Sequence, residues 1–125
     1  MIYDTDILIW VQRGNEKAAK LIEKDNDKYL SIQSYMELLQ GAKNKTHHKY
    51  VKDFISEFKF SILPLTENIG HRALIYVAEY ALSSNMRAGD AIIAATAIEN
   101  NIILVSSNAK HFKVVKELQL KTFKP

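Results

Sequence analysis

The sequence predicts an α/β sandwich, with a mainly parallel sheet in the middle and helices on both sides. Short apolar runs of strand length alternate along the chain with longer segments whose apolar residues recur at helical spacing. One run, residues 102–106, is almost continuously apolar, which is typical of a strand covered on both faces. Strands and helices that alternate in this way favour a parallel sheet between helical layers.

The first half of the chain is expected to contain two strands and four helices. An apolar pair opens a short strand at residues 2–4, and the helical segment at 5–12 ends near Gly14. The polar helix at 16–24 keeps one apolar side. The remaining elements expected here are a strand at 29–32 and helices at 34–42 and 46–58, both with apolar residues at helical spacing.

The second half is expected to contain three strands and two helices. Pro64 interrupts the first strand, and Thr66 is a candidate N-cap for the long helix that follows. The second helix is rich in alanine and apolar nearly all round, so it should be buried. In chain order these elements are residues 61–65, 66–82, 89–99, 102–106 and 120–123.

The composition favours one folded domain that spans residues 1–125. Hydrophobic residues make up 47% of the chain, enough for a core, and charged residues make up 25%, the usual share in globular domains. No apolar run approaches the roughly 20 residues of a membrane span, and no signal-peptide pattern is visible at the N-terminus. The chain has no cysteine, which excludes disulfides and thiolate metal sites. We therefore expect a cytoplasmic protein that does not contact a membrane.

The charge balance is mildly basic. There are 17 Lys and Arg residues against 14 Asp and Glu, a net charge of +3, and the isoelectric point is about 9.0. This excess permits a polyanionic partner such as a nucleic acid, but many ordinary domains carry a similar charge and need none.

Polar residues stand where predicted strands end or helices begin. Asp4 and Asn108 each follow a predicted strand, Glu37 lies in the first turn of a predicted helix, and Asp90 opens another. Because sites in parallel sheets gather at the carboxyl ends of the strands, we expect these four side chains to converge.

Most of these residues also have a purely structural explanation. Asp4 fits an N-cap, and Asn108 fits a loop or cap residue. Ser34 and Glu37 have the spacing of a capping box. The Glu of such a box normally faces solvent, whereas the apolar residues that flank Glu37 suggest a largely buried helix.

Asp90 indicates function more strongly than the other acids. The helix behind it is apolar, and the only polar side chain near it in the sequence is Arg87. Asp6 is better explained as a first-turn acid favoured by the helix dipole. His111 has no second histidine at ligand spacing, so it is expected to be structural or solvated.

Converging carboxylates would repel one another and raise a pKa. A hard cation such as Mg²⁺ or Mn²⁺ relieves this repulsion, because it prefers carboxylate and water oxygens. Such a site suits phosphodiester hydrolysis, since the cation lowers the pKa of a bound water and stabilises the charge of the transition state.

Three motifs resemble the PIN-domain nucleases, and among them the VapC-type toxins of bacterial toxin–antitoxin pairs. They are YDTDILIW at 3–10, SIQSYMELLQGA at 31–42 and GDAIIAATAIENNIILVSSNAKHF at 89–112. The last is the most specific, because it joins a metal-site helix, a strand and a polar loop in the order of the family. The resemblance covers essentially the whole chain and implies the PIN-like three-layer sandwich.

The resemblance also implies a set of site residues. Asp4, Glu37 and Asp90 match the three acids of the family, which are catalytic residues and ligands of Mg²⁺, with Mn²⁺ as the alternative. Asn108 matches the fourth catalytic position, where many relatives carry Asp. A neutral amide is a poorer ligand, so we expect one firmly held ion, with Asn108 ordering water.

For the activity, the resemblance implies a metal-dependent endoribonuclease toxin. Such toxins cleave a cellular RNA, often a tRNA or rRNA, usually form homodimers, and are neutralised by a cognate VapB-type antitoxin. Arg87, one turn before Asp90, and Lys110, beside Asn108, are the candidates from the sequence for binding RNA phosphates. Either is equally explained as a solvated surface charge.

Two alternatives remain. A haloacid-dehalogenase-like phosphatase would use Asp4 as its nucleophile, but Leu8 stands where that family has Thr or Val, and no second acid follows Asp90 closely. A PIN-like scaffold that binds RNA or protein without cutting is kept open by Asn108 and weakened by the three acids.

Overall fold

Five short strands form the central sheet of the computed structural model, which describes residues 1–125. Every pair of neighbouring strands is parallel, so all carboxyl ends lie at one edge of the sheet. The expected mainly parallel sheet is confirmed. In the sheet order β3-β2-β1-β4-β5, the strands are β1 (Ile2–Tyr3), β2 (Tyr29–Ser31), β3 (Ser61–Leu63), β4 (Leu104–Ser106) and β5 (Leu120–Thr122).

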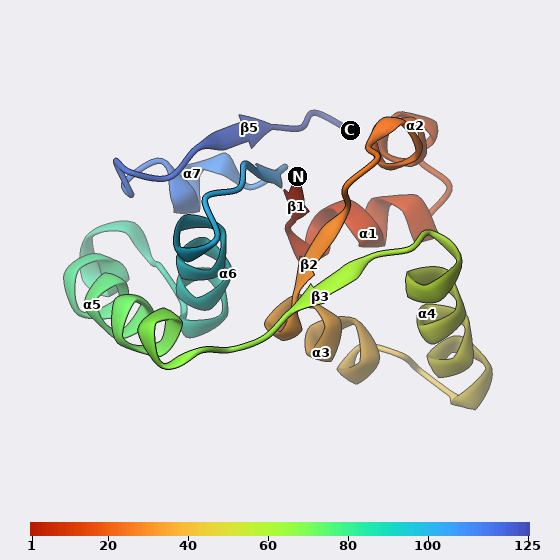
Figure 1. The fold of residues 1–125 in the computed structure, drawn as a ribbon, viewed down its shortest axis with the longest axis horizontal. Helices are drawn as coiled ribbons and strands as arrows, with labels where there is room; N and C mark the ends of the chain where they lie inside the picture. The colour runs from red at the N-terminus through yellow and green to blue at the C-terminus, as the bar shows by residue number, and fades with distance from the viewer.

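Helices cover both faces of this sheet, which confirms the three-layer sandwich (Figure 1). None of them has both the length and the hydropathy needed to cross a bilayer. On one face lie α1 (Thr5–Gln12), α2 (Glu16–Lys24), α3 (Ile32–Gln40) and α4 (Lys45–Glu57); on the other lie α5 (Glu67–Ser84), α6 (Ala88–Glu99) and α7 (Ala109–Phe112).

Alternation along the strands divides the core into two halves. Ile2 and Leu104 belong to the half under α5–α7, while the next residues, Tyr3 and Val105, belong to the half under α1–α4. All four side chains are fully buried. The central strands are therefore apolar on both faces, as the sequence of the 102–106 run predicts.

The alanine-rich helix α6 is the most deeply buried helix. Ala91, Ala94, Ala95 and Ala97 have no exposed surface or almost none. Their small side chains allow α6 to lie close to both the sheet and α5, as expected for a helix without a polar face.

The boundaries of several elements differ from the sequence prediction. Helix α3 begins two residues early, because Ser31 and not Ser34 is its N-cap, and Ser31 Oγ accepts from Ser34 N at 3.0 Å. The capping box is therefore wrong, and Glu37 lies in the second turn of α3. Strand β3 ends at Leu63, before Pro64, and the short helix α7 was not expected.

The packing of α6 predicts that it does not tolerate larger side chains. The substitution Ala94→Leu should lower the free energy of unfolding by about 1–3 kcal/mol, because the added carbons have no space in the core. The control change Ser56→Leu, at an exposed position of α4, should cost less than about 0.5 kcal/mol. Urea unfolding of both variants measures the difference, and equal losses would contradict the packing argument.

Candidate active site

Asp4 lies at the carboxyl end of β1 and is only 7% exposed. Its backbone N–H donates to Val105 O of β4 at 2.9 Å. Its Oδ1 accepts from Thr5 N at 2.8 Å, and its Oδ2 accepts from Ser106 Oγ at 2.7 Å. The N-cap role is confirmed, and the bond from Ser106 additionally fixes the carboxylate against the end of β4.

Ser106 connects Asp4 to the loop that carries Asn108. Ser106 Oγ accepts from Asn108 N at 2.9 Å while its own hydroxyl donates to Asp4. Asn108 occupies the N-cap position of the short helix α7 without a side-chain capping bond, and its Nδ2 lies 3.1 Å from His111 Nδ1. Asn108, which was expected to follow β4, is therefore linked to Asp4 through hydrogen bonds to a single residue, Ser106.

Glu37 reaches the same edge of the sheet from α3. Its Oε1 accepts from Thr5 Oγ1 at 2.8 Å. Because Thr5 directly follows Asp4 in the chain, this bond holds Glu37 close to Asp4. The start of α6 also lies against it: a Cβ on Gly89 would stand 3.5 Å from Glu37 Oε2 and 3.3 Å from Gln33 Nε2. The lack of a side chain at Gly89 lets α6 begin directly beside α3.

Asp90 is the third residue of α6, which begins at Ala88. Its Oδ2 accepts a long hydrogen bond of 3.4 Å from Arg87 N and lies 3.4 Å from His111 Nδ1. His111, which was expected from the sequence to be structural or solvated, thus faces both Asp90 and Asn108. The tautomer of the ring decides which of the two it bonds.

Asp6 lies closer to this cluster than the sequence indicated. Its Oδ2 accepts from both the backbone N–H and the hydroxyl of Ser107. Its Oδ1 is buried and has no hydrogen-bond partner in the protein. Sequence reasoning missed Ser106 and Ser107, although Ser106 ends β4 and Ser107 follows it, the same signal that identified Asn108.

The acids of this edge affect one another electrostatically. Burial, the largest effect, and the negative charge of Asp6 raise the pKa of Asp4 to about 8, with a smaller contribution from Asp90. Burial also raises the pKa of Glu37, aided by the charge of Asp90 and opposed by the bond from Thr5. Asp4, Glu37, Asp90 and Asp6 therefore form one electrostatic cluster, called the acid cluster below.

The acid cluster fits a hard divalent cation in its chemistry. It offers carboxylate oxygens, one of them buried without a partner, and a cation would reverse the repulsion that raises the pKa of Asp4. No three acidic or imidazole groups are close enough to form a closed set of ligands. That spacing suits Mg²⁺, which keeps several waters and needs only one or two direct carboxylates.

The two basic residues expected to bind RNA both lie beside the acid cluster. Arg87 precedes α6 and Lys110 lies on α7, and both are exposed to solvent. Neither forms an ion pair with a carboxylate. Their role in binding RNA stays a prediction.

Comparison with known protein families shows which family of α/β proteins this chain belongs to. The model of the PIN domain matches residues 1–118, nearly the whole chain. The chain belongs to the PIN-domain family. This membership removes the haloacid-dehalogenase-like alternative and confirms the family that the three motifs indicated.

Individual relatives place this PIN domain near the VapC proteins. Ribonuclease VapC10 of Mycobacterium tuberculosis is 30% identical over 123 residues, which cover 95% of this chain and 90% of the relative. A toxin–antitoxin complex from Klebsiella pneumoniae contains a chain with 26% identity and a TM-score of 0.80, covering 97% of this chain and 95% of that one. VapBC2 of Rickettsia felis, bound to a DNA fragment from its promoter, shares the fold at 24% identity with a TM-score of 0.80, covering 99% of this chain and 100% of that one.

The raised pKa of Asp4 predicts how the stability of the metal-free PIN domain depends on pH. An unfolded aspartate has a pKa of about 3.9, whereas that of Asp4 in the folded protein is about 8. Asp4 therefore contributes its full stability only below the unfolded pKa, and this contribution is lost as the pH rises towards 8. In EDTA, the Tm should fall by several degrees between pH 5.5 and pH 8.

The control for this prediction is Asp4→Asn. The amide keeps an oxygen for the bond from Thr5 N but does not ionise, so this variant should lose most of the slope and melt higher at pH 8 than the parent. Differential scanning calorimetry measures both. Identical slopes for the parent and the variant would show that Asp4 does not titrate in this range.

Proposed function

We propose that this PIN domain is a metal-dependent endoribonuclease of the VapC type, a toxin that cleaves a cellular RNA by phosphodiester hydrolysis. The observation that carries the proposal is the acid cluster, in which Asp4, Glu37 and Asp90 come from three separate segments to the carboxyl end of β1. The relationship to a mycobacterial ribonuclease supports the same activity. A tRNA or rRNA is the expected class of substrate.

Asp4, Asp90 and Glu37 are the residues that would hold Mg²⁺, or Mn²⁺ in its place, one or two of them directly and the rest through water on the ion. The bound ion supplies a water of lowered pKa and stabilises negative charge on the phosphate. Thr5 and Ser106 hold the Asp4 carboxylate, and Thr5 also holds Glu37, so the ligands are positioned before substrate arrives. Asn108, held by Ser106, is placed to order a water beside the acids.

An antitoxin is the proposed regulatory partner. Solved relatives of this fold from Klebsiella pneumoniae and Rickettsia felis are toxin–antitoxin assemblies. By analogy, a VapB-type antitoxin would cover the acid cluster and keep the nuclease inactive in the cytoplasm, where its RNA substrates are made.

The activity can be tested with bacterial total RNA in Mg²⁺, in Mn²⁺ and in EDTA. The protein should produce discrete fragments only with a cation. Asp4→Asn and Asp90→Asn should each lower the rate at least about 100-fold, since loss of a ligand costs more than the 10–100-fold typical of its supporting partners. Asp53→Asn, on the exposed face of α4, is the matched control and should cleave normally.

This test also addresses the non-catalytic alternative. If RNA stays intact with either cation while circular dichroism shows a folded protein, the scaffold that only binds becomes the better explanation. Calorimetric titration with Mn²⁺ then shows whether the acid cluster holds an ion at all.

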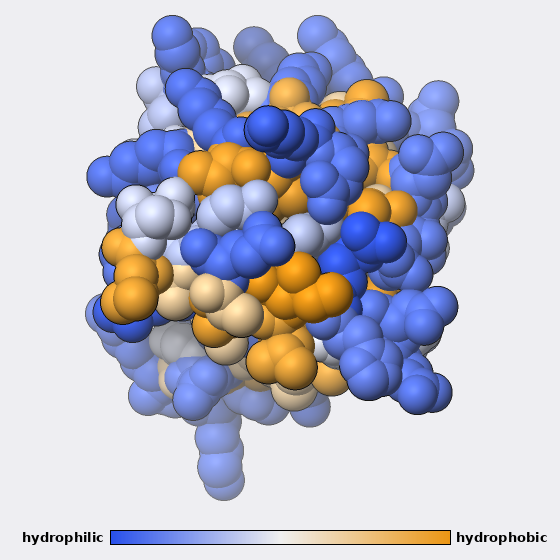
Figure 2. Space-filling view, turned by 90° about the vertical axis from the view of Figure 1, so that its left-hand side faces the viewer, coloured by the Kyte–Doolittle hydropathy of each residue, from blue (hydrophilic) through white to orange (hydrophobic).

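A homodimer is the proposed assembly, and α5 provides the surface that supports it. Leu74, Ile75 and Leu82 are 66%, 55% and 102% exposed, although large apolar side chains are usually buried. Beside them, α5 and the start of α6 enclose an apolar cavity of about 320 Å³ that includes Leu65 and Ile92. Figure 2, which faces the α5 side, shows apolar residues gathered among hydrophilic ones.

Dimer formation through α5 predicts that a negative charge introduced on this surface separates the dimer into monomers. Leu74→Glu should shift the protein from dimer to monomer, because burying an unpaired carboxylate in an apolar interface is strongly unfavourable. Tyr50→Glu, at a comparably exposed apolar residue on α4, should leave the dimer intact. Sedimentation velocity measures both masses, and a dimer that survives Leu74→Glu would rule out this surface.

A further inference from the structure

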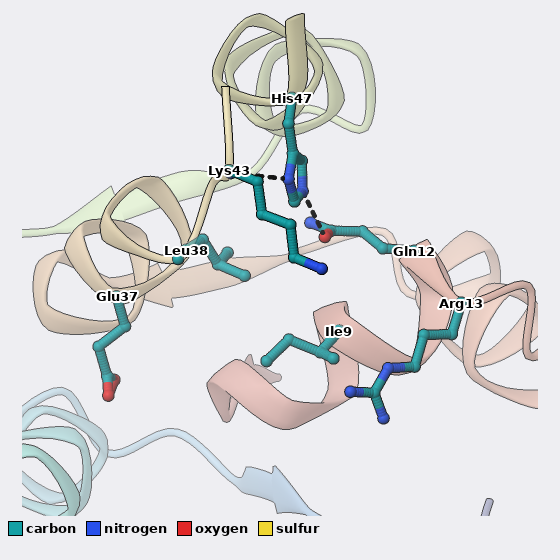
Figure 3. Close-up of a pocket in the computed structure, with 8 residues that line it drawn as sticks. Ile9, Gln12, Arg13, Glu37, Leu38, Lys43 and His47 are labelled. Carbon is teal, nitrogen blue, oxygen red and sulfur yellow. Dashed lines mark hydrogen bonds between the residues drawn. The ribbon is translucent and has the colours of Figure 1, made fainter. Parts of the chain in front are cut away.

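A groove runs from the acid cluster along the outer side of α1. It has a volume of about 350 Å³ and is bounded by α1, by α3 and by the start of α4 (Figure 3). Glu37 lies at one end, so the groove is continuous with the acid cluster. The lining residues are Ile9, Gln12, Arg13, Glu37, Leu38, Gly41, Lys43 and His47.

Two cations project into this groove without an acidic partner. Figure 3 shows the Lys43 ammonium and the Arg13 guanidinium directed into the space between the helices. Both residues are exposed, and neither forms a salt bridge. The guanidinium lies 5.7 Å from the centre of the Trp10 ring, a cation–π contact that orients Arg13 before any ligand binds.

Gln12 supplies an unused hydrogen-bond donor in the same groove. Lys43 N donates to His47 Nδ1 at 3.3 Å, so the ring carries its proton on Nε2 and directs it to Gln12 Oε1 at 3.4 Å. This orientation leaves Gln12 Nε2 buried without a partner. An unmade bond of this kind is unfavourable, and an acceptor on a ligand would recover it.

The charges of the groove and of the acid cluster are complementary to a nucleic acid strand. Acids alone would repel a polyanion, so a nuclease needs cations beside them to hold the flanking phosphates. Arg13 and Lys43 provide such cations in the groove that has Glu37 at one end, while Leu38 and Ile9 contribute apolar surface to its lining.

We propose that this groove holds the RNA strand adjacent to the bond that is cut. Arg13 and Lys43 bind backbone phosphates, and the Gln12 amide donates to an oxygen or ring nitrogen of the same strand. This inference rests on the proposed nuclease function and assigns its substrate-positioning surface. It adds to Arg87 and Lys110, which lie at α6 and α7 and not along α1.

The test measures binding separately from cleavage. The probe is a fluorescein-labelled single-stranded RNA of mixed sequence, titrated by anisotropy at several salt concentrations with protein inactivated by Asp4→Asn. Adding Arg13→Ala and Lys43→Ala to this background should weaken binding. The slope of log affinity against log salt should shrink by about 1.4, since each lost phosphate contact on a single strand accounts for about 0.7.

The control removes two positive charges from another surface. Lys20 and Lys24 are exposed on α2, beside a separate cavity next to β5. The double variant Lys20→Ala/Lys24→Ala should keep both the affinity and the salt slope. Gln12→Leu, which removes the unused donor, should weaken RNA binding without changing the slope.

Three outcomes would overturn the inference. One is an unchanged affinity and slope in the Arg13/Lys43 double variant, and another is an equal loss in the Lys20/Lys24 control. The third is unchanged RNA binding with lost binding of a poly-glutamate peptide, which would assign the groove to an acidic protein segment.

Cleavage assays keep this inference distinct from the proposed function. If the parent protein cuts RNA and the Arg13/Lys43 double variant cuts equally well, the groove assignment fails while the nuclease assignment stands. If the parent never cuts RNA although the salt slope changes as expected, the nuclease assignment fails and the groove remains an RNA-binding surface.

Discussion

The register between β1 and β4 is the constraint on which the site depends. Ile2 pairs with Leu104 and Tyr3 with Val105, so Asp4 stands beside Ser106 and receives its hydroxyl proton. A slip of one residue would reverse the faces of the strand, moving Tyr3 into the wrong half of the core and removing the bond to Asp4. The two halves of the apolar core therefore also fix the position of the acid cluster.

The Asp4, Glu37 and Asp6 carboxylates of the cluster are held by neutral donors and not by counter-ions. Thr5, Ser106 and Ser107 each donate to a carboxylate, yet Asp4 keeps a strongly raised pKa because burial and neighbouring charge outweigh these bonds. Such an arrangement is unfavourable on its own, and the proposed cation would offset the repulsion. The extensive packing of α6 and α1 against the sheet supplies the stability that this local repulsion removes.

Much of this arrangement was predictable from the sequence, and the limits have physical causes. The parallel sheet, the buried α6 and the positions of Asp4, Asp90 and Asn108 at strand or helix ends follow from hydrophobic periodicity. The cap of α3 was misplaced because Ser31 and Ser34 are both good N-cap residues. Ser31 is the cap because β2 ends there, which the local sequence does not show. The contacts from Ser107 to Asp6 and from Thr5 to Glu37 join segments far apart in the chain, and no local pattern encodes them. The Arg13/Lys43 groove was missed for the same reason.

The place of β4 beside the central strand β1 has a consequence for the timing of synthesis. Strand β1 is made first, but one of its two neighbours in the sheet is β4, at residues 104–106. Until that segment has left the ribosome, Asp4 lacks Ser106, and the loop that carries Asn108 does not exist. A growing chain therefore cannot assemble the geometry of the acid cluster, which arises only at the end of synthesis.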